Sequence, residues 1–300
     1  MKVLTIHFSQ SGQLTEILTN FTQPFNGVEM EHQFIVPKNK FPFPWDVKTF
    51  FETMPESVLE IPIELEAINY NYSKYDLVII GYQPWFLSPS LPITSLLKDE
   101  QFKHIIKDTP IITVIGSRNM WLNSQESVKK LIQQAGGKLV GNVALADKSD
   151  NLIGVITILH WMLKGEKTRK WGIFPKPGVS DEDIENVKLF GEFAAQALKK
   201  NDWNNFQNQV IQNDGVVVRT NILFIEQKAK RLFIIWANLI LKQAKKGKRS
   251  FWVNAFKYYL IFVLFVVSPI LLILYRVLIW PFTFKKVEAR KKYFQQIAIK

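Results

Sequence analysis

The sequence contains no cysteine and only four histidines among its 300 residues. Without cysteine the chain has no disulfide bonds, thiolate zinc sites, iron–sulfur ligation or cysteine nucleophile. The histidines are far apart and lack the spacing of metal ligands, so we expect no metal centre. No secretory leader opens the chain, because Met1 and Lys2 lead directly into a strand pattern. We therefore expect the N-terminal domain to stay in the cytosol.

Acidic residues are scarce in the last part of the sequence. From Gly215 to Lys300 there are 17 Lys and Arg against two acids, a balance of +15, whereas residues 1–214 carry a balance of −3, which together make the net charge of +12. A near-neutral globular part is thus followed by a strongly basic region. Such an asymmetry points to nucleic acid or to an anionic membrane surface.

A long apolar run decides between these two partners. Tyr258–Tyr275 is interrupted only by Ser268 and Pro269, and as a helix it would cover about 27 Å, close to the hydrocarbon thickness of a bilayer. Aromatic residues lie toward its ends and Lys and Arg flank it on both sides, as at membrane interfaces. Because nucleic-acid binding would need these aromatics exposed, we predict anionic lipid and no nucleic acid. Residues 251–284 are the expected anchor, at the cytoplasmic face of the inner membrane.

Two features of the basic region leave its topology open. Basic residues on both flanks give no preferred direction, and Pro269 near the middle allows either a tilted span or a shallow hairpin. Asn221–Lys242 has the period of an amphipathic helix, which would either lie on lipid or dock on the N-terminal domain.

The N-terminal two-thirds alternates short apolar runs with helical patterns. This alternation predicts an α/β fold with a doubly wound, five-stranded parallel sheet over residues 1–200. A proline-rich excursion over 38–66 and an insert over 147–178 interrupt the rhythm, and residues 201–300 form the C-terminal helical membrane-associated region. The expected strands are Val3–Phe8, Glu31–Val36, Tyr75–Tyr82, Pro110–Gly116 and Lys138–Ala146. The expected helices of this part are Leu14–Thr22, Ile93–Phe102, Ser124–Gln134 and Ser180–Lys199.

The loop Ser9–Thr15, with the sequence SQSGQLT, follows the first strand and opens the first helix. Small hydroxyl residues and Gly12 allow successive amides to face inward, and the helix N-terminus adds its positive end. The loop therefore predicts a cradle for a phosphate that uses N–H donors without Lys or Arg. In a parallel sheet such a site lies beyond the carboxyl ends of the strands.

This loop resembles the phosphate motif of the flavodoxin-like family, which binds FMN. Ser9, Ser11 and Gly12 match the motif, whereas Leu14 replaces its last hydroxyl residue and Thr15 follows one position later. The resemblance implies that the loops after the third and fourth strands enclose the flavin ring, with Trp85, Phe86 and Trp121 available for stacking. The cofactor-binding residues that it implies are Ser9, Gln10, Ser11, Gly12, Gln13, Leu14, Pro84, Trp85, Phe86, Ser117, Arg118, Asn119, Met120 and Trp121.

Over most of its length the chain is also similar to the dialkylresorcinol-condensing group of flexirubin pigment pathways. The loops SQSGQL, QPWFLSPS and SRNMWL and the basic apolar tail carry this resemblance. It implies an aromatase that oxidises an alkylated cyclohexenone or cyclohexanedione to a resorcinol, with a ketosynthase as pathway partner. The candidate catalytic residues are Arg118 for a developing negative charge, Tyr82 for hydrogen bonding and His160 for proton transfer. Leu152–Leu163 is a candidate apolar lid for a lipid-like substrate.

Two other functions fit the same residues. One is an electron carrier or quinone reductase that serves a membrane partner, and the other is a scaffolding subunit that kept the fold and lost the flavin. Flavodoxin-like oxidoreductases often pair, so the resemblance also implies a homodimer. The electron acceptor that reoxidises the flavin is left open by the sequence.

Overall fold

The computed structural model describes residues 1–299, with only the backbone at positions 151, 221 and 279. Its centre is a five-stranded sheet in the order β2-β1-β3-β6-β7, in which every neighbouring pair is parallel. This is the flavodoxin-like strand order, and it confirms the predicted fold class. The strands are β1 (Lys2–His7), β2 (Glu29–Phe34), β3 (Leu77–Tyr82), β6 (Pro110–Ser117) and β7 (Lys138–Ala146).

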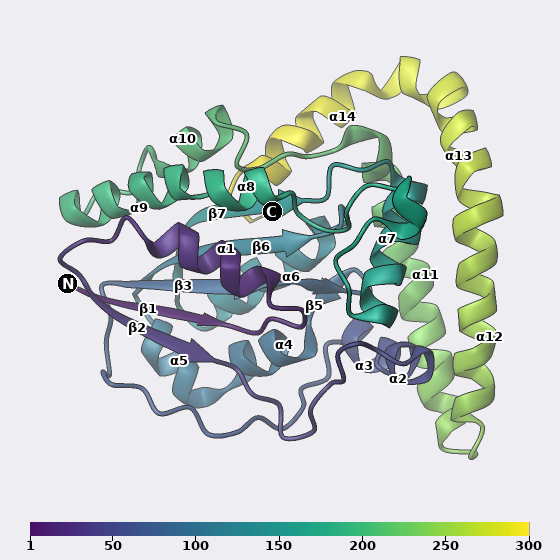
Figure 1. The fold of residues 1–300 in the computed structure, drawn as a ribbon, viewed down its shortest axis with the longest axis horizontal. Coiled ribbons are helices and arrows are strands. Elements are labelled where there is room, and N and C mark those ends of the chain that lie inside the picture. Colours follow the sequence, from purple (N-terminus) through teal and green to yellow (C-terminus); the bar gives the residue numbers. More distant parts are fainter. Residues whose placement is uncertain (300) are drawn as a thin grey trace.

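Helices cover both faces of this sheet, as the alternating pattern predicts (Figure 1). One layer holds α1 (Gln13–Thr22), α8 (Asp181–Asn186) and α9 (Lys188–Lys200), and the other holds α4 (Leu91–Lys98), α5 (Glu100–Ile106) and α6 (Leu122–Gln134). The single helix expected over Ile93–Phe102 is broken at Asp99, whose carboxylate caps α5 by accepting from the Phe102 amide at 2.8 Å. A further short helix, α10 (Phe206–Gln212), packs against β7.

Several smaller elements gather beyond the carboxyl ends of the strands. The proline-rich excursion contains two short helices, and the loop after β3 folds into a two-stranded hairpin. The apolar part of the insert is a helix, as its composition suggests. These elements are α2 (Val47–Glu52), α3 (Met54–Val58), β4 (Pro84–Trp85), β5 (Ser88–Pro89), α7 (Asn151–Lys164) and the short turn η1 (Lys170–Gly172).

The basic region forms two antiparallel helices followed by a bend (Figure 1). The first is α11 (Thr220–Ala244). The second begins with α12 (Arg249–Phe262) and runs through a π-helical turn η2 (Val263–Val267), α13 (Ser268–Leu274), a second π-helical turn η3 (Tyr275–Ile279) and α14 (Trp280–Gln295). Among the described residues, one helix, Arg249–Leu278, is long and apolar enough to cross a membrane by length and composition.

The chain stays helical through Pro269 instead of reversing there, so the shallow hairpin is not observed. A proline ring crowds the carbonyl of the preceding turn and removes one amide donor. The π-helical turn immediately before it supplies the extra backbone length that relieves this crowding. The apolar run is therefore a single rod that bends only near η3.

The helix α11 docks on the N-terminal part of the molecule, which settles the alternative left open by its amphipathic pattern. Ala237 and Ile240 of α11 are fully buried in a second hydrophobic cluster with Phe256 of α12 and with Phe51 and Met54 of the excursion. The main core lies between the sheet and its two helical layers. The second cluster thus joins the C-terminal helices to the carboxyl-end side of the sheet.

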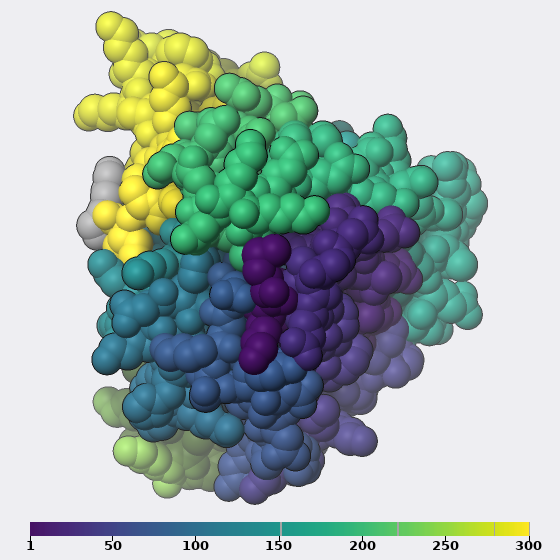
Figure 2. Space-filling view, turned by 90° about the vertical axis from the view of Figure 1, so that its left-hand side faces the viewer, coloured from purple at the N-terminus to yellow at the C-terminus, as the bar shows by residue number. Residues whose placement is uncertain are grey.

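Figure 2 shows the molecule from the left-hand side of Figure 1, where the strands begin. The sheet and its helices fill the centre of this view, the yellow α14 lies against the green segment that holds α9 and α10, and the yellow-green end of α11 emerges at the lower edge. The end of α11 and the helix α14 therefore reach opposite edges of the same α/β body.

Candidate functional site

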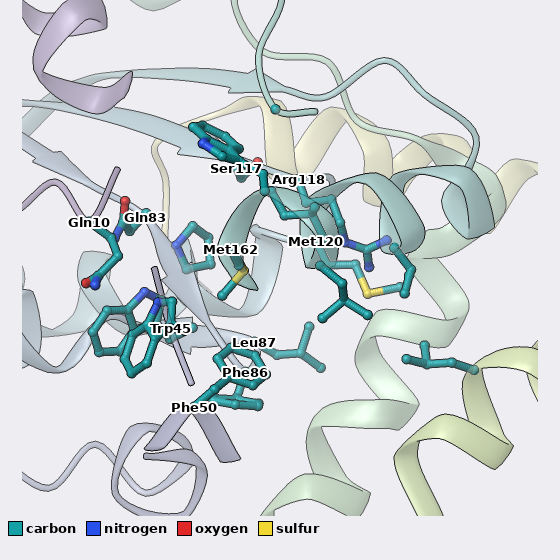
Figure 3. A pocket seen from close by; sticks show the side chains of 18 of the residues that line it. Gln10, Trp45, Phe50, Gln83, Phe86, Leu87, Ser117, Arg118, Met120 and Met162 are labelled. Atoms are coloured by element: carbon teal, nitrogen blue, oxygen red, sulfur yellow. The ribbon is translucent and has the colours of Figure 1, made fainter. Parts of the chain in front are cut away.

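A cavity of about 360 Å³ lies beyond the carboxyl ends of the strands. The three loops predicted from the sheet topology form one side of it, and the excursion, α7, α11 and the helix from α12 to α13 form the rest. Its volume falls at the lower end of the range for pockets that hold small molecules. Figure 3 shows aromatic side chains of the excursion and the hairpin on one side of the space and Arg118 and Met120 on the other.

The first loop turns at Gly12, whose φ of 87° and ψ of −24° belong to the left-handed region. Gly12 is the N-cap of α1 and supplies no side-chain cap, so the first amides of the helix have no intrahelical acceptor. Within the described residues, the buried Ser9 Oγ and Gln10 Oε1 atoms also have no hydrogen-bond partner. Free helix amides beside the unpartnered Ser9 hydroxyl, which can donate a hydrogen bond, fit the phosphate end of a mononucleotide.

The remaining side chains of this loop are committed to neighbouring segments. Gln13 donates to the Val179 carbonyl and accepts from the Val179 amide, both at 3.1 Å, and Gln10 donates to the Pro42 carbonyl at 2.8 Å. Gln10, Ser11, Gln13 and Leu14 all line the cavity. Backbone amides, and not the glutamine side chains, are therefore the donors left for an anion.

Thr15 takes a different role from the hydroxyl of the family motif. Its Oγ1 lies 2.9 Å from His7 Nε2, at the end of β1. Burial lowers the pKa of His7 to about 4, with a smaller contribution from His32, so the imidazole is neutral near pH 7. This pair holds the start of α1 against β1 and adds no positive charge to the loop.

The second loop forms the β4–β5 hairpin, with Phe86 and Leu87 at its tip. Both have positive φ, 47° and 62°, a strained conformation for residues with side chains that often marks a functional turn. Pro84, Trp85 and Phe86 line the cavity, as the resemblance implies.

The aromatic rings at this loop belong to a larger cluster from the excursion. The Trp85 ring packs edge-on against Trp45 at 5.5 Å between centroids, and Phe86 packs against Phe50 at 4.9 Å. Sequence reasoning missed Trp45 and Phe50, which also line the cavity. The signal available was the clustering of aromatics among prolines in FPFPW, which we interpreted only as an irregular excursion.

The third loop divides its residues between the cavity and the core. Ser117, Arg118 and Met120 line the cavity, but Asn119 and Trp121 are buried beside it and do not. Trp121 is 1% exposed at the N-cap of α6, and its ring fills the main core. The expectation that Trp121 stacks on a flavin is therefore wrong: a ring at the start of this helix points under the loop.

Two predicted catalytic residues also lie outside the cavity wall formed by the described residues. Tyr82 is fully buried, donates to Gln125 Oε1 at 2.5 Å, and has its pKa raised well above 10 by that burial. His160 is half-buried on α7, whereas the neighbouring Leu159, Trp161 and Met162 face the cavity. We therefore correct both assignments, because neither side chain reaches the space that a ligand would occupy.

Arg118 does line the cavity, and its side chain extends from the loop toward the C-terminal helices (Figure 3). Burial lowers its pKa to about 10, which Asp147 and Glu226 oppose by their negative charge. At neutral pH the guanidinium is still protonated. It is the cationic group that the third loop places at the apolar end of the cavity.

Glu226 of α11 is a buried partner of this arginine that sequence reasoning missed. Its Oε1 accepts from the Asn123 amide at 2.9 Å, whereas Oε2 has no hydrogen-bond partner in the described part of the chain. Burial raises the pKa of Glu226 to about 7, which hydrogen bonds from Asn123 and the charge of Arg118 partly oppose. A signal existed in the sequence, since Glu226 falls on the apolar face of α11, four residues after Ile222.

Replacement of this carboxyl gives a test by pH. Between pH 4.5 and about 7, Glu226 is ionised in the unfolded chain but protonated in the folded one, so the stability that it contributes is lost as the pH rises through this window. The loss amounts to about 3 kcal/mol. Glu226→Gln keeps an acceptor for Asn123 and removes the titration. We expect denaturant unfolding of the full chain in detergent to show the variant more stable than wild type above pH 7 and similar to it below pH 4.5.

The matched control is Glu16→Gln, which removes one carboxylate from the exposed surface of α1. Its stability should follow the wild-type pH profile. Parallel profiles for Glu226→Gln and wild type would contradict the buried protonated state.

The insert closes the cavity on the side of α7. Val155, Ile158 and Trp161 face the space, and the Trp45 amide donates to the Met162 carbonyl at 2.7 Å, which ties α7 to the excursion. The helix α7 thus covers the cavity in the position expected of a lid. The following loop exposes Trp171, 75% accessible, at the surface.

Comparisons with known proteins were made for the whole chain. No protein-family model and no curated protein matches it. A flavoprotein in complex with FMN from Lactobacillus acidophilus is similar with a TM-score of 0.40 and 19% identity, over 48% of this chain and 92% of that chain. A flavodoxin from the domain Archaea is similar with a TM-score of 0.37 and 11% identity, over 66% of this chain and 99% of that chain. Flavodoxin 1 from Bacillus cereus is similar with a TM-score of 0.35 and 15% identity, over 67% of this chain and 98% of that chain. These similarities concern the fold alone.

Proposed function

We propose that the protein is an FMN-dependent oxidoreductase that acts on an alkylated ring at a membrane surface. The observation that carries this proposal is a single continuous cavity, which joins the uncapped N-terminus of α1 to a chamber walled by aromatic and aliphatic side chains. One end suits a phosphate and the other suits a flat apolar ring system followed by an alkyl substituent.

The residues of the chain divide the work of binding. The amides that follow Gly12 would hold the phosphate, and Trp85 and Phe86 would flank the flavin ring from the hairpin. The guanidinium of Arg118 would stabilise negative charge on the reduced flavin or on a substrate enolate. Burial raises the pKa of the Glu226 carboxyl to about 7, so the negative charge that it places beside Arg118 depends on the pH. The lid α7 and the helix α12 keep water away from the ring.

The reaction we propose is oxidation of a dialkylated cyclohexane-1,3-dione, or of its hydroxycyclohexenone tautomer, to the resorcinol, in lipid or pigment biosynthesis. When bound, FMN supplies the acceptor for a hydride from a ring carbon, while the neighbouring proton leaves to a base or to water. The ring thus loses two hydrogens and becomes aromatic. We place the protein at the cytoplasmic face of the inner membrane, anchored by residues 251–284. A ketosynthase that assembles the ring would supply the substrate.

An electron carrier serving a protein partner is supported less well. Such a partner must approach the edge of the flavin, and here α7 and α12 close over the space in front of the loops. A covered site favours a small substrate that enters the cavity.

The experiment uses the full chain purified in detergent with added FMN. We expect a visible flavin absorption band that co-purifies with the protein. Anaerobic addition of a dialkylated cyclohexane-1,3-dione should bleach this band and release one resorcinol for each flavin reduced, so no external acceptor is needed. A chain that stays colourless with added FMN contradicts the flavin assignment. A yellow chain that is not bleached contradicts the aromatase assignment only.

A further inference from the structure

The helix from α12 through α13 has two apolar faces. Its inner face lines the cavity with Leu260, Leu264 and the buried Ser268. Its outer face has no charged residue between Tyr258 and Tyr275. Large apolar side chains on that outer face are exposed to an extent unusual for a surface in water: Tyr258 66%, Phe262 56%, Ile270 54%, Ile273 65%. Val277 of η3, 65% exposed, follows beyond the exposed Arg276.

The beginning of this rod is fastened to the α/β body. The guanidinium of Arg249 donates to the Glu52 carbonyl and to the Glu56 carboxylate, each at 2.8 Å. One turn further on, Val253 and Phe256 are buried in the second hydrophobic cluster. The helix therefore starts in firm contact with the excursion.

The other end returns to the same body. The Tyr293 hydroxyl donates to Glu126 at 2.7 Å, and the buried Lys129 donates to the Gln296 carbonyl at 2.9 Å. Midway, Tyr275 stacks on Phe224 of α11 with 4.8 Å between ring centroids. A helix that crossed a bilayer would have to release one of these ends, because the two sides of the hydrocarbon core are about 30 Å apart.

Positively charged side chains lie at both ends of the exposed apolar face. The turn from α11 to α12 and the surface of α14 carry exposed basic residues, and the only acids after residue 214 are the buried Glu226 and the partly buried Glu288. An apolar strip with cationic ends complements the acyl boundary and the headgroups of an anionic leaflet. The exposed cations are Lys242, Lys245, Lys246, Lys248, Lys285, Lys286, Arg290 and Lys292.

The cavity reaches the surface on this same face. Among the described residues that line it, only Ile261 and Phe265 are exposed, 46% and 42%, and both lie on α12 and its π-helical turn among the outward apolar side chains. The mouth of the cavity is thus part of the apolar strip.

We propose that α12 and α13 lie in the plane of an anionic membrane surface, with their outer face in the acyl region, and that the cavity opens between Ile261 and Phe265 into lipid. The site then takes a ligand with an alkyl chain directly from the membrane. The ligand part rests on the proposed function, whereas the position of the helix does not. This geometry differs from both the span and the hairpin considered from the sequence.

The absence of native cysteine allows a depth measurement with single nitroxide labels on the full chain. Each variant is bound to vesicles of phosphatidylglycerol and phosphatidylcholine in equal parts, and collisions with oxygen and with a water-soluble nickel chelate are compared. The labelled variants are Tyr258→Cys, Ile261→Cys, Phe265→Cys, Ile273→Cys and Val277→Cys. The aqueous reference is Asn26→Cys, at an exposed position near the amino-end side of the sheet.

For a helix in the plane, all five labels should lie at one shallow depth, with the oxygen-to-nickel ratio raised roughly tenfold over Asn26→Cys. A spanning helix would instead place Phe265→Cys and Ile273→Cys deepest and the outer two near opposite surfaces. A helix in water would give five ratios equal to the reference. Either result overturns the proposal, and nickel-accessible labels at Ile261 and Phe265 alone overturn the lipid-facing mouth.

Flavin absorption is recorded on the Asn26→Cys, Tyr258→Cys and Ile273→Cys samples, whose labels do not line the cavity, so the two proposals fail separately. A uniform shallow depth in a colourless protein would keep the membrane geometry and remove the redox function. A yellow protein with water-exposed labels would do the reverse.

Discussion

Replacement of Gly12 by valine is expected to remove FMN binding from an otherwise folded protein. Nothing lies within 4 Å of a Cβ built at this position, so the effect is conformational and not steric crowding. A β-branched residue strongly disfavours the φ of 87°, and relaxing it would turn the amides of the first helical turn away from the phosphate. Loss of two charge-assisted hydrogen bonds weakens binding by about 3 kcal/mol, roughly a hundredfold or more. The FMN affinity of each variant is measured by the quenching of FMN fluorescence on addition of the purified chain.

A matched control is available at Gly27. It also has a positive φ, 72°, and open space around its Cβ, but it lies in an exposed turn after α1, away from the cavity. Gly27→Val should cost a similar few kcal/mol or less in stability and leave FMN affinity unchanged. Equal FMN affinities for the two variants would show that the turn at Gly12 does not hold the phosphate.

Removal of four positive charges from the turn between α11 and α12 is expected to reduce membrane binding by about three orders of magnitude. Each Lys near an anionic surface contributes about 1 kcal/mol, so four neutral residues cost about 4 kcal/mol of binding free energy. Sedimentation with phosphatidylglycerol vesicles at low salt measures the partition coefficient. The substitutions are Lys242→Gln, Lys245→Gln, Lys246→Gln and Lys248→Gln.

The control variant loses the same charge at the amino-end side of the sheet, opposite the apolar strip. Its partition coefficient should stay close to that of wild type, and high salt should reduce the difference between the two variants because exposed charges are screened. An equal loss in both variants would mean that net charge alone, and not the position of the helix, drives binding. The control substitutions are Lys107→Gln, Lys138→Gln, Lys199→Gln and Lys200→Gln.

The sheet was predictable because each strand is a short apolar run followed by a helical pattern. The alternation predicts a doubly wound parallel sheet, and with it the three loops that meet at the carboxyl ends. The position of the loop Ser9–Thr15 was predictable for the same reason, since it depends only on β1 and α1. The break at Asp99 was not, because a local cap competes there with an uninterrupted helical period.

The candidate site was predictable only as far as the backbone places it. Which way a loop side chain points depends on packing, so Trp85 and Trp121 looked alike in the sequence although one lines the cavity and the other fills the core. Trp45 and Glu226 come from segments far from the loops in sequence. Their place in or beside the site depends on tertiary contacts that no local pattern encodes.

Whether the apolar run packs on the rest of the protein could not be predicted from the sequence, because it depends on tertiary contacts. Length and composition describe a helix that fits a bilayer, and the same residues satisfy a helix with one face on protein and the other on lipid. The contacts of Arg249 and Tyr293 with the α/β body favour the second arrangement over a span. They are ordinary polar contacts that appear only when both partners are placed in space.

The order of the elements along the chain has a consequence for biosynthesis. Because synthesis runs from the N-terminus and domains fold as units, the sheet and the surfaces around Glu56 and Glu126 are in place before the apolar rod leaves the ribosome. The rod therefore emerges beside a finished docking surface, and its inner face is covered at once. In the proposed in-plane position, a newly made chain would need no passage through a translocation channel to bring its outer face to the lipid.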